Sequence, residues 1–109
     1  MPLQFLEFDA SEDTDGLRNW DAVASPAPRH NPALLDELRA VLTHVAGALG
    51  AEGPLDDGHA WDLDLHIQDE QHRPLLPEAA RACPLRLTLS LSLSGTQALA
   101  DLMDELAQD

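Results

Sequence analysis

The chain has 109 residues and a formal net charge of −14 at pH 7, and its six Lys and Arg positions are all arginine. This charge repels nucleic-acid backbones and anionic membrane surfaces, so we expect no nucleic-acid binding and no membrane binding. It also favours solubility and attracts basic partners. The N-terminus lacks the basic and apolar regions of a signal peptide, which leads us to expect a cytoplasmic protein.

The length and the apolar content of 44% are typical of one globular domain, so residues 1–109 are predicted to form a single α+β domain. The arginine usage and the abundance of alanine, leucine and aspartate are typical of a GC-rich bacterial genome. No glycine-rich phosphate loop, paired cysteine motif or dinucleotide fingerprint appears. We therefore expect no cofactor, and no motif points to a particular family.

The first half of the chain is predicted to contain two strands and one long helix. Residues 3–8 form the first predicted strand, which is apolar on both faces, and the acidic segment 9–16 connects it to a strand over residues 19–25. Asn31 is expected to cap the helix, with Pro32 at its first position. An apolar stripe then runs to Leu49, and Gly50 provides the stop.

The second half repeats this order with clearer periodicity. Residues 61–68 and 85–94 alternate apolar and polar side chains, which indicates strands with one covered face and one polar face. A last helix is expected to begin at Ser94, whose capping box would include Gln97. The order β-β-α-β-β-α predicts a two-layer α+β fold, with a four-stranded antiparallel sheet and two helices on one face. A circular permutation of the ferredoxin-like fold fits this pattern, and so does another pairing of two ββα units.

Two acidic segments are candidates for a divalent-metal site. On the strand 61–68, Asp62, Asp64 and His66 alternate, so their side chains project from one face and could hold zinc, manganese or iron. In the acidic connection, Asp9, Asp13 and Asp15 could bind a cation, although the sequence does not complete a calcium-binding loop of the EF-hand type. The alternative for both segments is a solvated surface.

No catalytic residues are assigned. Ser90 and Ser92 are predicted to share the sheet face with Asp64 and His66, which makes a serine–histidine–aspartate arrangement topologically conceivable. However, no strained nucleophile turn or oxyanion hole is evident from the sequence. We therefore expect a protein without enzymatic activity.

Four apolar residues are the candidates for binding a partner. Leu3 and Phe5 are expected on the open face of an edge strand. Leu75 and Leu76 lie in the long connection 69–84, where they tuck under the sheet, cover its open face over Leu3 and Phe5, or bind something else. The leading hypothesis is a small acidic interaction or accessory module of a bacterium, which binds another protein or forms a homodimer. A divalent-metal-binding protein and an acidic inhibitor of a basic partner protein are the alternatives.

Overall fold

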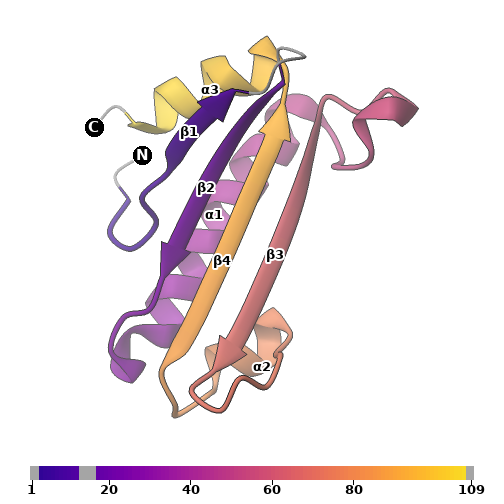
Figure 1. The fold of residues 1–109 in the computed structure, drawn as a ribbon. Helices are drawn as coiled ribbons and strands as arrows, with labels where there is room; N and C mark the ends of the chain where they lie inside the picture. Colours follow the sequence, from indigo (N-terminus) through magenta and orange to yellow (C-terminus); the bar gives the residue numbers. More distant parts are fainter. Residues whose placement is uncertain (1–2, 13–16, 108–109) are drawn as a thin grey trace.

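The structure is a computed structural model that describes residues 3–12 and 17–107. Its centre is a four-stranded sheet formed by β1 (Asp9–Glu12), β2 (Arg18–Ala24), β3 (Trp61–Asp69) and β4 (Leu87–Gly95) (Figure 1). The strand order is β1-β2-β4-β3, and every neighbouring pair is antiparallel. This order is compatible with the predicted permutation of a ferredoxin-like fold.

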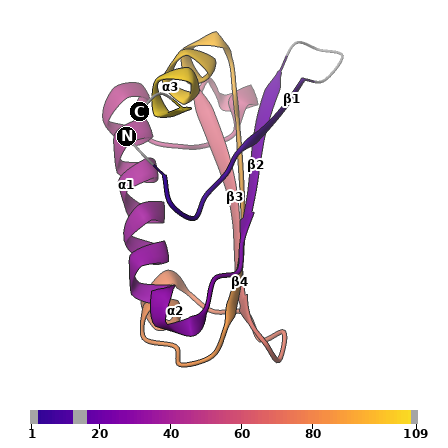
Figure 2. The ribbon, with the colours of Figure 1, turned by 90° about the vertical axis from the view of Figure 1, so that its left-hand side faces the viewer.

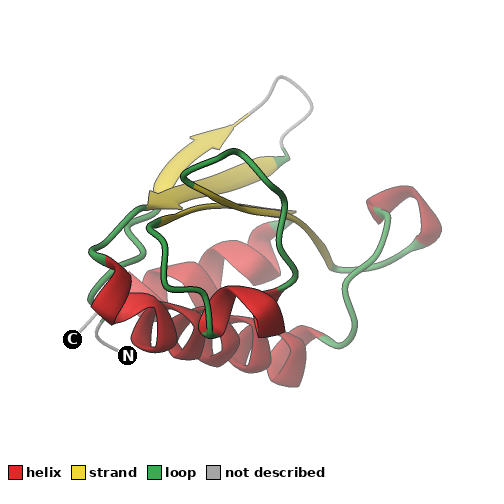
Figure 3. Cartoon of the chain, turned by 90° about the horizontal axis from the view of Figure 1, so that it is seen from below, coloured by secondary structure: helices red, strands yellow, loops and turns green. Residues whose placement is uncertain are grey.

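The helices α1 (Asn31–Leu49) and α3 (Gln97–Ala107) both lie on one side of the sheet (Figure 2). Three short helical segments complete the described chain: η1 (Pro28–His30), η2 (Leu55–Asp57) and α2 (Pro77–Arg81). Viewed from below, the helices form one layer and the strands the other (Figure 3). The predicted two-layer α+β class is therefore confirmed. No helix in residues 3–12 and 17–107 combines the length and apolar character needed to cross a membrane.

The core lies between the sheet and the helices and is mainly aliphatic. β4 supplies four leucines to it that are at most 1% exposed, at positions 87, 89, 91 and 93. They meet the apolar stripes of α1 and α3, which include Leu34, Val41 and Leu99. The strict alternation of β4 explains this arrangement, because successive side chains of a strand point to opposite faces.

Both ends of α1 are held by side-chain hydrogen bonds to other segments. Asn31 does not cap the helix as expected: its buried Nδ2 donates to the carbonyl oxygens of Cys83 and Leu85, at 3.0 and 2.9 Å. At the other end, Trp61 Nε1 donates to the Gly50 carbonyl oxygen at 2.8 Å. These bonds connect α1 to the segment that precedes β4 and to the first residue of β3.

The predicted strand over residues 3–8 is wrong, and so is the predicted start of the last helix. β1 is formed instead by residues 9–12, which pair with β2 from Asp9↔Asp21 to Glu12↔Arg18. This pairing needs only a short connection, whereas a strand over residues 3–8 would need a longer one. Ser94 remains in β4 between Asp62 and Asn19, and α3 begins only at Gln97.

We predict that Leu89→Ala destabilises the protein by about 2–5 kcal/mol, because it leaves a cavity at the centre of the core. Val23→Ala is the matched control, since Val23 lies one residue from the strand position paired with Leu89 but is 65% exposed. The control should change stability by less than about 0.5 kcal/mol. Urea unfolding measures both values, and equal losses would contradict the assignment of the two sheet faces.

Candidate functional site

The face of the sheet opposite the helices carries a row of polar side chains across all four strands. The register aligns Asp64 with Ser92, Ser92 with Asp21, and Asp21 with Asp9. Ser92 Oγ donates a hydrogen bond to Asp21, and His66 Nε2 lies 3.1 Å from Asp64 Oδ1. Three carboxylates in one row make this face negative, and like charges on neighbouring strands weaken their pairing.

The predicted metal ligands on β3 do not converge on one point. Asp64 and His66 contact each other, but Asp62 Oδ1 accepts a hydrogen bond from the backbone N–H of Leu63 at 2.8 Å. Within residues 3–12 and 17–107, no three His, Cys, Asp or Glu side chains are grouped closely enough to hold a metal ion. Of the acidic-connection candidates, Asp13 and Asp15 lie outside the described residues, so a metal site remains a prediction from sequence.

The predicted serine–histidine–aspartate residues lie on one face of the sheet, but the hydrogen bonds that would activate a serine are not formed in the described structure. Ser90 is aligned with His66 in the register of β3 and β4, and Ser92 is aligned with Asp64. In the described part of the chain, however, Ser92 donates to Asp21, and neither serine is hydrogen-bonded to His66. The open face therefore shows no activated serine.

The four predicted partner-binding residues lie at opposite edges of the sheet. Leu3 and Phe5 belong to the segment beside β2 on the helix side, whereas Leu75 and Leu76 belong to the connection that folds back beside the last residues of β3 (Figures 1 and 2). Leu75 donates its N–H to Ile67 and is half-buried, while Leu76 is 77% exposed. The expected position of Leu3 and Phe5 on the open face, next to Leu75 and Leu76, is therefore wrong.

Glu37 of α1 holds the segment that contains Leu3 and Phe5. Its carboxylate accepts the backbone N–H groups of Gln4, Phe5 and Leu6, the last two at 2.9 and 2.7 Å. With these donors occupied by a side chain, the segment is held beside α1 rather than in the sheet. Leu6 becomes part of the core, and the Phe5 ring lies 5.6 Å from the His30 ring, measured between centroids.

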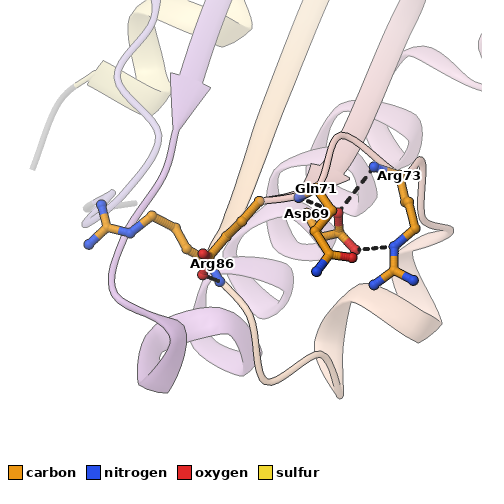
Figure 4. Close-up of polar contacts among 5 residues, drawn as sticks. Asp69, Gln71, Arg73 and Arg86 are labelled. Atoms are coloured by element: carbon orange, nitrogen blue, oxygen red, sulfur yellow. Dashed lines mark hydrogen bonds and ion pairs between the residues drawn. The ribbon is translucent and has the colours of Figure 1, made fainter.

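The connection between β3 and β4 is organised around the buried carboxylate of Asp69 (Figure 4). Asp69 accepts hydrogen bonds from the backbone N–H of Gln71 at 2.8 Å and from both the backbone N–H and Nε of Arg73 at 3.1 Å. Burial alone would raise the pKa of Asp69, but these hydrogen bonds outweigh it and hold the pKa below the ordinary value. The connection predicted to bind a partner is thus tied to its own strand.

A groove lies between α3 on one side and residues 3–8 with β1 on the other. Its larger part, about 390 Å³, is bounded by an apolar set that consists of Leu3, Leu6, Phe8, Trp20, Met103 and Leu106. Two carboxylates, Glu7 and Asp104, border this part. A second part of about 280 Å³ shares Ala10, Trp20 and Asp104 with the first and adds Glu12 and Arg18. We call the two parts together the β1–α3 groove.

The sequence alone indicates only one wall of the β1–α3 groove. Leu3 is among the residues predicted to bind a partner, but the spacing of Met103 and Leu106 is that of any apolar helix face packed on a core, and the acids near them fit the exposed face of the same helix. Their role as groove residues depends on how far β1 stands from α3, which no local pattern reports. A second apolar hollow, about 430 Å³, lies between α1, α2 and Leu65 of β3.

The two edges of the sheet differ in how their backbone groups are satisfied. Along β3, outward groups of four residues form hydrogen bonds with neighbouring segments or with a side chain: Trp61 with Gly53, Leu63 with Asp62, Ile67 with Leu75, and Asp69 with Arg73. Along β1, the described structure shows hydrogen bonding only toward β2, and all four residues are exposed. The edge beside the β1–α3 groove is therefore open, and the edge beside the second hollow is largely closed.

The comparisons with known proteins leave the site to be interpreted from its geometry. No family model, no curated protein and no solved structure matches the chain.

We predict that Glu37→Ala lowers stability by about 1.5–3 kcal/mol, because three backbone donors lose a charged acceptor. Glu37→Gln keeps an acceptor oxygen and should cost less. Amide hydrogen exchange at Gln4, Phe5 and Leu6 should become faster in the alanine variant. Unchanged exchange at these three amides would contradict the role of Glu37 as the anchor of this wall of the groove.

Asp69 should contribute to the pH dependence of stability on the acidic side. Because its pKa in the folded protein lies below the ordinary value of 3.8, the unfolded chain binds the proton more readily. The contribution is complete above that ordinary value and is lost as the pH falls through it toward the lower folded value. Asp69→Asn should therefore flatten the acid limb of a plot of melting temperature against pH. Asp56→Asn, an exposed control in η2, should leave that limb in place.

Proposed function

We propose that the protein is a non-enzymatic interaction module that binds a basic segment of another protein through the β1–α3 groove. The observation that carries this proposal is the composition of the groove: apolar residues bound it, and its three carboxylates, Glu7, Glu12 and Asp104, outnumber the single cation in its lining, Arg18. Arginine and lysine suit such a surface, because their aliphatic stems can cover apolar atoms while the charged ends meet carboxylates.

The overall charge supports a basic partner over a second copy of the chain. Two molecules that each carry a formal charge of −14 repel one another, and a twofold contact through the groove would bring its carboxylates together. A basic partner is attracted from a distance, which raises the rate of association at low ionic strength. A homodimer through this groove is therefore the weaker proposal.

The same geometry accommodates the alternative of an acidic inhibitor. Binding a basic segment inhibits the partner when that segment is part of its working surface, and it makes the protein an accessory factor otherwise. Both roles use the same groove and the same chemistry. The composition leads us to propose a bacterial protein as the setting for either role.

The proposal is tested with an amphipathic peptide of arginine and leucine and its glutamate–leucine counterpart. We expect binding of the arginine peptide only, with an affinity that falls as salt is added. The double variant Glu7→Gln/Asp104→Asn should weaken this binding about fivefold. The matched control Glu52→Gln/Glu105→Gln changes the charge equally at exposed acids outside the groove and should bind like the original protein.

Equal binding of the two peptides, or an equal loss in the two double variants, would overturn the proposal. The first result would show that charge does not select the partner. The second would show that the overall charge attracts the peptide and that the groove does not hold it.

A further inference from the structure

The outer edge of β1 lies directly beside the β1–α3 groove. β1 is the terminal strand of the sheet, and its residues Asp9–Glu12 form ladder pairs only with β2. In an antiparallel sheet, an edge strand directs alternate N–H and C=O groups away from its neighbour, where another strand can pair with them. Ala10 belongs to this strand and also lines both parts of the groove.

We propose that the partner segment binds as an added β-strand along the outer edge of β1, antiparallel to it. This inference rests on the proposed function, because it uses the same groove and the same basic partner. Strand addition obtains affinity from main-chain hydrogen bonds and specificity from pockets that receive alternate side chains. The free edge supplies the first of these requirements and the β1–α3 groove supplies the second.

The other edge of the sheet shows why the proposal is specific to β1. β3 is the longer edge strand, but segments from elsewhere in the chain pair with its outward groups, and Gln68 forms an isolated bridge with Pro74. Folded proteins commonly protect edge strands in this way. In the described structure β1 has no such cover, so its edge is the one available for pairing.

The register of β1 predicts the side chains of the added strand. Ala10 and Glu12 face the helix side, since they are aligned with the buried Trp20 and with Arg18. Asp9 faces the open side, where it is aligned with Asp21. A partner strand should therefore place an apolar residue beside Ala10 and basic residues beside Asp9 and Glu12. Because the strand is antiparallel, its sequence reads basic, any residue, apolar, basic.

The acidic row on the open face adds a reason for a basic residue beside Asp9. Asp9, Asp21 and Asp64 are aligned on this face through Ser92, so the row carries three carboxylates and is flanked by one histidine, His66, whose Nε2 contacts Asp64. A basic side chain from an added strand would extend the row and reduce the repulsion between Asp9 and Asp21. This gain is absent when the added strand is neutral or acidic.

The experiment uses the complete chain and a blocked peptide with the central order arginine, threonine, valine, arginine. Two modified peptides carry N-methyl groups on alternate backbone nitrogens, one set for each edge of the peptide strand. Only one edge can pair with β1, so one modified peptide should bind about tenfold more weakly than the unmodified peptide, and the other should bind nearly as well. Binding of the unmodified peptide should also slow amide exchange in β1 and leave β3 unchanged.

The outcomes separate this inference from the proposed function. If the arginine peptide binds better than a glutamate counterpart but both methylated peptides behave alike, strand addition is wrong and the basic partner remains. If the arginine peptide has no advantage over the glutamate peptide, both proposals fail. A concentration-dependent dimer that the peptide dissociates would assign the edge of β1 to a second copy of the chain and would overturn the proposed occupant.

Discussion

The alternation of leucine with serine and threonine along β4 is the constraint on which the rest of the structure depends. β4 pairs with β2 on one side and with β3 over its whole length on the other. A slip of one residue would exchange its four buried leucines for hydroxyl side chains and flip the entire face. The alternation in β4 therefore determines the register of β2 and β3 and the face of the sheet on which α1 and α3 pack.

At the end of β4, close packing also limits which residue can stand between the strand and α3. Gly95 is the last residue of the strand, and a Cβ atom placed there would lie 2.8 Å from Cδ2 of Leu99 and 2.9 Å from the carbonyl oxygen of Ala60. Only glycine allows α3 and the segment before β3 to approach this closely. The strand therefore continues to Gly95, beyond the serine at which sequence patterns predicted the helix to begin.

Most of the fold could be predicted from sequence because its main elements have long and regular patterns. The two alternating strands, the long helix and the helix-covered sheet were all correctly expected. The segment 3–8 was not, because its apolar residues suit a strand as well as an extended segment packed beside a helix. Glu37 decides between the two, and it lies more than 30 positions along the chain. The predicted capping role of Asn31 is wrong for the same reason: its hydrogen-bond partners, Cys83 and Leu85, lie far along the chain, just before β4.

The candidate site was less accessible to sequence reasoning than the fold. In the sequence its acidic residues fit ordinary solvated positions, and its apolar residues other than Leu3 fit ordinary core positions. What distinguishes them is the distance between β1 and α3 and the absence of a covering segment in the described structure, both of which are tertiary properties. The closed edge of β3 was equally hidden, because residues from the connections on both sides of that strand supply its hydrogen bonds.

The two ends of the described chain meet at the same groove. Leu3 near the N-terminus and Leu106 in the last turn of α3 both border it, and the ends lie side by side on this side of the molecule (Figures 1 and 2). Each described end is only two residues from its terminus, so a purification tag fused to either terminus can reach this surface of apolar and acidic residues. A tag rich in histidine, lysine or arginine would compete with a ligand there, so binding assays call for a cleavable tag and a comparison before and after its removal.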